Sequence, residues 1–77
     1  MTMLTMLEID GTMTQIEAIE ADEGFMHLQG GAFAACTQKG LHLYKSGNEY
    51  YLADEQKQVV AVGMTTIKSY ISFFVMK

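Results

Sequence analysis

The stretch LHLYKSGNEYYLAD, residues 41–54, decides the fold because two alternating apolar runs flank a short turn in it. Alternation of apolar and polar residues is typical of a half-buried strand, and a glycine-containing turn between two such runs predicts a β-hairpin. A two-residue loop with Gly47 in its first position suits a type II′ turn. This loop places Leu43 opposite Leu52. The alternative is a three-residue loop over 46–48, which would move one strand's side chains to the other face.

The two-residue loop gives this hairpin one apolar face and one partly polar face. The apolar face is predicted to be core and carries Leu41, Leu43, Tyr50 and Leu52. The other face is predicted to be an outer surface and carries His42, Tyr44 and Tyr51. Tyrosine is enriched where one end of a side chain is apolar and the other is wet. The outer face is therefore a candidate patch for a protein partner, with ordinary strand surface as the alternative.

A second hairpin is predicted around Asp10-Gly11, because Asp-Gly between alternating apolar residues favours a type I′ turn. Its two-residue loop would pair Leu7 with Thr14. The shared face would then hold Met3, Leu7, Ile9, Ile16 and Ala18. The segment 14–24 has an alternative as a short helix that starts with a capping-box pair and ends at a glycine. We expect a strand, because the helical stripe would contain only two isoleucines.

The rest of the chain continues as short segments separated by glycine. Strands are predicted at 25–29 and 59–62, and a single 3₁₀ turn at 64–67. The last segment, 68–77, fits a helical stripe that begins at Ile67, but its β-branched and aromatic content favours a strand. The expected fold is all-β, with at most one short helix: an antiparallel barrel or sandwich of six or seven short strands. The 3₁₀ turn before a final strand resembles the rhythm of SH3-like barrels, which are the best single expectation.

Composition limits the class of protein. The 77 residues predict one small domain over 1–77, and 49% apolar content with 18% charged residues argues against disorder. Nine acidic residues against five lysines, without arginine, argue against direct nucleic-acid binding. No apolar run approaches the length of a membrane span. Cys36 is the only cysteine, and no export signal is visible, so a cytoplasmic location is expected.

As a strand, the last segment would be apolar on both faces. One face would show Tyr70, Phe74 and Met76, and the other Ile71, Phe73 and Val75. Antiparallel strands of a small domain normally leave one face to water. Each large apolar side chain stabilises by about 1.5–3 kcal/mol on burial, so three exposed ones would forgo much of the domain's stability. We therefore expect Tyr70, Phe74 and Met76 to form an assembly interface, with a second copy as the expected partner.

The other chemistry-bearing residues give weaker signals. His27, Cys36 and His42 match no metal-ligand spacing, so neither a metal nor a cofactor is expected, and the same thiol lacks the electropositive surroundings of a catalytic nucleophile. The acidic run over 17–23 contains Glu17, Glu20, Asp22 and Glu23. Such a run most often forms a solvated edge, and the alternative is a negative patch for a basic partner.

These patterns predict a non-enzymatic protein-interaction module that self-associates, most simply as a homodimer. One alternative is a small-molecule-binding barrel, in which inward aromatic side chains line a pocket. Another is an acidic inhibitor or regulator that docks on a basic macromolecule. No phosphate-binding glycine loop and no nucleophile elbow is present in the sequence.

Overall fold

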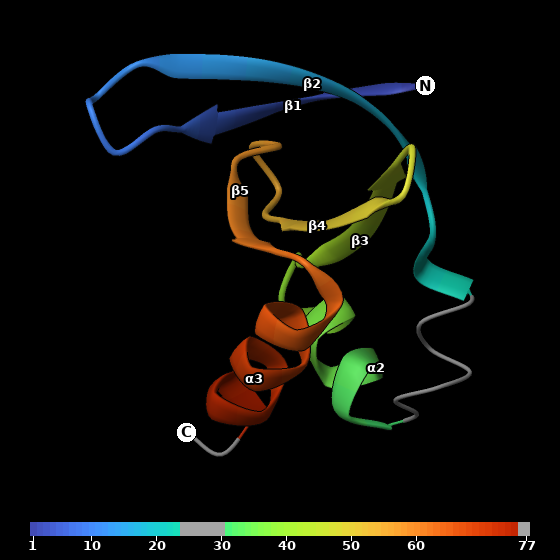
Figure 1. Ribbon diagram of the computed structural model, residues 1–77. Coiled ribbons are helices and arrows are strands. Elements are labelled where there is room, and N and C mark those ends of the chain that lie inside the picture. The colour runs from blue at the N-terminus through green and yellow to red at the C-terminus, as the bar shows by residue number, and fades with distance from the viewer. Residues whose placement is uncertain (24–30, 76–77) are drawn as a thin grey trace.

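The computed structural model describes residues 1–23 and 31–75, and this part of the chain forms a curled antiparallel sheet with two helices (Figure 1). The strands are β1 (Thr2–Leu7), β2 (Met13–Glu20), β3 (His42–Ser46), β4 (Glu49–Ala53) and β5 (Val59–Val62), and the helices are α2 (Gly31–Gln38) and α3 (Met64–Val75). The strands follow one another in the order β1-β2-β3-β4-β5, and the sheet curls into a half-barrel. The prediction of a β-rich antiparallel fold is confirmed, with five strands in the described residues.

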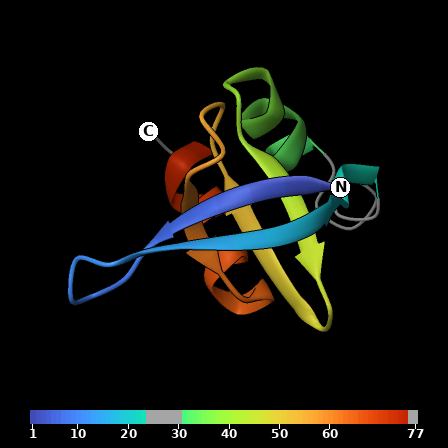
Figure 2. The same cartoon turned by 90° about the horizontal axis from the view of Figure 1, so that it is seen from above.

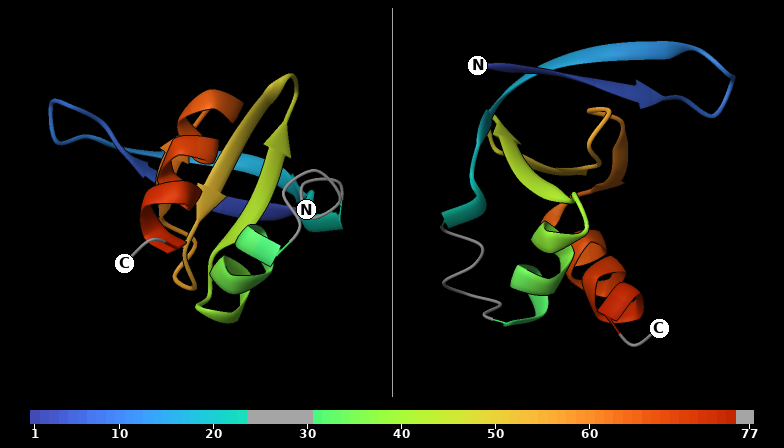
Figure 3. Two further views of the ribbon diagram at one scale, coloured as in Figure 1. Left: turned by 90° about the horizontal axis from the view of Figure 1, so that it is seen from below. Right: turned by 180° about the vertical axis from the view of Figure 1, so that it is seen from behind.

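The elements lie in three layers (Figure 1). The β1–β2 hairpin crosses over one face of β3, β4 and β5, and its turn projects beyond them (Figure 2). The two helices cover the opposite face of the same strands (Figure 3). The central strands are therefore covered on both faces, whereas a sheet in a two-layer fold is covered on one face.

The β3–β4 hairpin has the predicted register. Leu43 pairs with Leu52, as a two-residue loop requires. Gly47 has a φ of 61°, whereas Asn48 does not have a positive φ, which is the combination of a type II′ turn. The predicted core face is confirmed, because Leu41, Leu43 and Leu52 are buried and Tyr50 packs against them.

The β1–β2 hairpin has a different register from the predicted one. Its turn has three residues: the Glu8 N–H donates to the Thr12 carbonyl (2.7 Å), and the Gly11 N–H donates to the Glu8 carbonyl (3.0 Å). Gly11 has a φ of 89°, so the glycine serves a turn with one left-handed residue, not a type I′ turn with two. Leu7 consequently pairs with Met13.

This one-residue difference exchanges the faces of β1. Leu4, Ile16 and Ala18 share the face that packs on the sheet, with Leu4 and Ala18 buried. Met3 and Leu7 lie on the other face, so the prediction that they share a face with Ile16 is wrong.

The segment after β2 turns away from the sheet and is followed by α2. The strand interpretation of the segment after Thr14 is confirmed by β2, whereas the predicted strand at 25–29 lies outside the described residues. Helix α2 ends in a Schellman motif, in which the Leu41 N–H donates to the Cys36 carbonyl and the Gly40 N–H to the Thr37 carbonyl (both 3.0 Å). Gly40 has a φ of 91°, the left-handed conformation that this motif requires.

The predicted C-terminal strand is wrong, because helix α3 begins at Met64 and continues to Val75. The predicted 3₁₀ turn at 64–67 is the first turn of this helix. Ile67 and Ile71, one helical turn apart, are 0% and 1% exposed and pack on the sheet. Packing of this stripe outweighs the strand preference of β-branched and aromatic residues, which depends strongly on context. The ribbon with two apolar faces, from which a companion chain was expected, is therefore absent.

The three layers enclose two separate cores. The larger core lies between the sheet and the helices and contains Phe33, Cys36, Leu41, Leu43, Leu52, Ala61, Ile67 and Ile71. The smaller core lies between the sheet and the β1–β2 hairpin and contains Leu4, Ala18, Tyr44 and Ala53. Both faces of the central strands thus contribute to the stability of the fold.

Candidate functional site

The β1–β2 hairpin carries most of the exposed apolar side chains among the described residues. Met3, Leu7, Ile9 and Met13 are 49%, 67%, 108% and 56% exposed, and we call this group the hairpin surface. Their exposure follows from the register, because the opposite face of the hairpin is the one that packs on the sheet. Leu7 and Met13 are cross-strand partners, and neighbouring exposed apolar side chains mark contact surfaces more often than single scattered ones.

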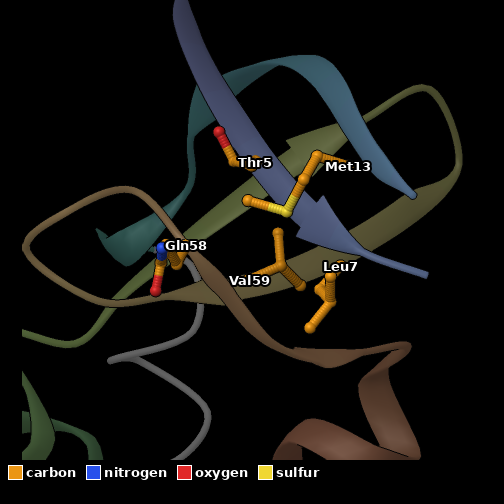
Figure 4. Close-up of a pocket in the computed structure, with 5 residues that line it drawn as sticks. All are labelled: Thr5, Leu7, Met13, Gln58 and Val59. Carbon is orange, nitrogen blue, oxygen red and sulfur yellow. The ribbon is translucent and has the colours of Figure 1, made fainter. Parts of the chain in front are cut away.

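A small pocket opens where this hairpin passes β5. It has a volume of about 210 Å³ and is lined by Thr5, Leu7, Met13, Gln58 and Val59 (Figure 4). Three of these side chains are apolar and two are polar. We call this hollow the seam pocket, because it lies between the two outermost strands of the half-barrel.

Beside the seam pocket, β1 pairs at one position with the two residues that directly precede β5. The Thr5 N–H donates to the Lys57 carbonyl (2.8 Å), and Thr5 forms an isolated parallel bridge with Gln58. Further along β1 the described residues show no pairing with β5. The half-barrel is therefore fastened at one point and open beyond it, and we call this opening the seam.

The seam leaves an edge of β1 available for hydrogen bonding. In an antiparallel pair, alternate residues direct their N–H and C=O groups to the partner strand and away from it. Because the Thr5 N–H points away from β2 to reach Lys57, the same alternation directs the backbone groups of Leu7 away from β2. An unpaired strand edge of this kind is a template for pairing with another chain.

The first 23 residues have an unusual distribution of charge. They contain six acidic residues and no lysine: Glu8, Asp10, Glu17, Glu20, Asp22 and Glu23. All five lysines of the chain come later, at positions 39, 45, 57, 68 and 77. The hairpin is therefore acidic as well as partly apolar.

The predicted acidic patch does not act as one group. The Asp22 carboxylate is used inside the protein: Oδ1 accepts the Leu43 N–H (2.6 Å), and Oδ2 lies 2.8 Å from Nδ1 of His42. Glu17 and Glu20 are exposed but lie on opposite faces of β2, since side chains alternate along a strand. Asp22 is thus a structural residue that continues the contact between β2 and β3.

The predicted outer face of the β3–β4 hairpin lies under the β1–β2 hairpin. Tyr44 is only 1% exposed and belongs to the smaller core, and Tyr51 packs against the same core. The Lys57 ammonium donates to the Tyr44 hydroxyl (3.2 Å), and this hydrogen bond raises the pKa of Lys57. His42 is half-buried against Asp22. The expectation that these tyrosines and His42 form an outer face is therefore wrong at Tyr44, because a distant hairpin covers it.

The predicted assembly residues were grouped on a C-terminal strand, but this segment forms α3 in the structure. Tyr70 lies on α3 and packs against the larger core. The side chain of Phe74 and the whole of Met76 lie outside the described part of the structure. An interface at these positions remains a prediction.

The remaining candidates concern metals and thiol chemistry. Within residues 1–23 and 31–75, no three His, Cys, Asp or Glu side chains come together as metal ligands, and His27 lies outside these ranges. Cys36 is buried in the larger core, and burial raises the pKa of its thiol, so the thiolate is disfavoured. No described helix has both the length and the apolar character needed to span a lipid bilayer.

Sequence reasoning missed the seam pocket because its walls come from distant parts of the chain. Val59 and Gln58 meet Leu7 and Met13 only after the sheet has curled. Alternation along β1 predicts that each face of the strand carries some apolar side chains. Only the register of the hairpin shows which of the two faces is exposed. Comparison of the chain with protein-family models, with curated proteins and with solved structures found no match.

Proposed function

We propose that this protein is a non-enzymatic interaction module whose β1–β2 hairpin binds a basic protein. The observation that carries the proposal is the combination of an exposed apolar group with a local excess of acidic residues. Leu7, Ile9 and Met13 are 67%, 108% and 56% exposed on a hairpin whose strands contain no lysine. A partner that offers both apolar and basic side chains would satisfy both properties of this surface.

The exposed apolar area is large for so small a protein. Leu7, Ile9 and Met13 together leave the equivalent of more than two full side chains in water. At about 1.5–3 kcal/mol for each buried side chain, this is about 3–7 kcal/mol of unused stabilisation. The whole free energy of unfolding of a domain of this length is about 4–12 kcal/mol. Covering this surface would therefore be a substantial driving force for association.

The same charge distribution disfavours pairing between two copies of the hairpin. Two such surfaces in contact would bring acidic groups together without any lysine from either hairpin, and like charges in an interface oppose association. Self-association through Tyr70, Phe74 and Met76 remains a prediction that rests on composition alone. A small-molecule site is less well supported. The seam pocket of about 210 Å³ falls below the usual range of about 300–1,000 Å³, and a hollow of about 510 Å³ at the β1–β2 turn is lined by one apolar residue, Ile9, and three polar ones.

Two finer expectations belong with this proposal. We place the protein in the cytoplasm because its lone thiol would need no oxidising compartment. The SH3-like barrel stays a prediction, and the segment 64–67, on which the resemblance rests, forms the first turn of α3. The proposed contact depends on the half-barrel and its open seam.

The experiment measures binding of the protein to immobilised small basic proteins, with acidic proteins of similar size as controls. We expect binding to the basic set that weakens as salt shortens the Debye length from about 10 Å at 0.1 M to about 3 Å at 1 M. The double variant Glu17→Gln/Glu20→Gln should weaken it. The matched control Glu49→Gln/Glu55→Gln removes the same number of exposed charges away from β1 and β2 and should leave it unchanged. Equal weakening by both variants would refute a role for the hairpin.

A further inference from the structure

We infer that the bound segment of the partner is an extended, basic stretch that adds as a strand along β1 at the seam and places one apolar side chain in the seam pocket. This inference rests on the proposed function and adds the mode of binding to it. It requires three features that lie together in the structure: a free strand edge, an apolar hollow beside that edge, and a charge that selects the partner.

The strand edge supplies the hydrogen bonds. The bond from the Thr5 N–H to the Lys57 carbonyl (2.8 Å) lies at the last point where β1 pairs with the segment that leads into β5. Beyond it, the outward backbone groups of Leu7 have no pairing within the described residues. A strand laid along β1 would pair with these groups and so continue the sheet, which is the mode of peptide recognition called β-augmentation.

The seam pocket supplies the side-chain contact. Leu7 and Met13 form one wall and Val59 another, with Thr5 and Gln58 at the polar end (Figure 4). A cavity of about 150 Å³ is known to hold benzene in another protein, so about 210 Å³ suits a single aliphatic or aromatic side chain. In strand addition the backbone gives affinity, and pockets for alternate side chains give specificity.

The charge of the hairpin selects a basic occupant. Glu8 directly follows Leu7 at the end of β1, and Glu17 on β2 pairs with Met3 on β1. Lysine or arginine on the alternate positions of the added strand would meet this acidic surface. A second copy of the chain cannot present its own hairpin in this way, because residues 1–23 contain no basic side chain. A nucleic acid is excluded as the occupant by the same sign of charge.

The probe is a fluorescent peptide of about eight residues in which valine alternates with lysine, titrated with the whole protein and followed by anisotropy. Three further peptides are matched to it. One has the same composition with the lysines at one end and the valines at the other. The other two keep the alternation but are methylated on alternate backbone nitrogens, one peptide for each of the two phases. We expect the grouped peptide, and at least one methylated peptide, to bind at least about tenfold more weakly than the alternating peptide.

Two protein variants test the position of the peptide. Leu7→Ser removes a wall of the seam pocket and should weaken binding of the alternating peptide about tenfold. Ile19→Ser is the matched control, because Ile19 on β2 is also exposed but belongs neither to the hairpin surface nor to the lining of the seam pocket. Circular dichroism of both variants verifies that the fold is kept. Equal losses in the two variants would overturn the assignment to the pocket.

The remaining outcomes separate the mode of binding from the proposed function. If grouped and alternating peptides bind equally and methylation has no effect, strand addition is refuted while binding of basic partners stands. If no cationic peptide binds and Glu17→Gln/Glu20→Gln changes nothing, the proposed function fails as well. If sedimentation of the protein alone shows a dimer that Leu7→Ser dissociates, the occupant is a second copy and the inference is overturned.

Discussion

Replacement of Asp22 by alanine should destabilise the fold far more than replacement of any neighbouring acidic residue. The Asp22 carboxylate accepts the backbone N–H of Leu43 at 2.6 Å, and Leu43 itself is only 1% exposed. A hydrogen bond to a charged acceptor contributes about 1.5–3 kcal/mol, and its loss leaves a donor in the interior without a partner. The half-exposed pair with His42 adds at most about 1 kcal/mol.

We therefore expect Asp22→Ala to lower the free energy of unfolding by about 2–3 kcal/mol. For a domain of this size the corresponding fall in Tm is about 8–24 °C. Thermal unfolding followed by circular dichroism measures this value, and hydrogen exchange should show the largest loss of protection at the Leu43 amide. Glu23→Ala, which changes an exposed neighbour, is the matched control and should stay within about 0.5 kcal/mol of the parent.

Asp22→Asn separates the effect of the hydrogen bond from that of the charge, because its amide oxygen can still accept the Leu43 N–H without the negative charge. Its loss of stability should lie between those of the control and of Asp22→Ala. If Asp22→Ala and Glu23→Ala have the same Tm, the carboxylate is not a structural acceptor, and Asp22 belongs again with the exposed acidic residues.

Three further results are expected. Gly40→Ala should lower the free energy of unfolding by about 1–2 kcal/mol, because Gly40 has a φ of 91° and its new Cβ would also crowd the Glu55 side chain; a urea titration measures this, and an unchanged midpoint would contradict the helix cap. Ile67→Ala should lower it by about 2–5 kcal/mol, since Ile67 is 0% exposed in the larger core, whereas a strand with Ile67 in water would tolerate the change. Burial raises the pKa of the Cys36 thiol above its ordinary value of 9.0, so above about pH 9 the unfolded chain loses this proton first and stability falls with rising pH. Urea midpoints at increasing alkaline pH should therefore fall more steeply in the parent than in Cys36→Ala, and identical slopes would disprove the effect.

Local signals in the sequence predicted the parts of the fold that local geometry controls. The β3–β4 hairpin follows from alternation and from a glycine at the position where a type II′ turn needs positive φ. The β1–β2 hairpin was also predicted, but Gly11 suits the single left-handed position of a three-residue turn as well as a type I′ turn. Sequence alone cannot distinguish these two turns, and the difference of one residue decides whether Leu7 is buried or exposed.

Contacts between distant segments decided the parts that could not be predicted. The C-terminal segment had residues suited to either structure, and packing of Ile67 and Ile71 on the sheet selected the helix. Tyr44 is buried because the β1–β2 hairpin folds across its face, which no property of residues near Tyr44 indicates. The seam pocket is also made by segments that meet only in the folded state. Its position could therefore not be predicted from the sequence, although the apolar character of the residues that line it could.

The division of the apolar interior into two compartments has a consequence for how the molecule opens. The smaller compartment holds Leu4, Ala18, Tyr44 and Ala53, whereas the helices share the larger one with the central strands. Detaching the N-terminal ribbon would cost the contacts of the smaller compartment, the bond at Thr5 and the short pairing of β2 with β3, whereas the larger compartment would keep its contacts. Stability is therefore graded across the thickness of this protein, and the layer that carries the proposed contact surface is also the layer expected to separate first.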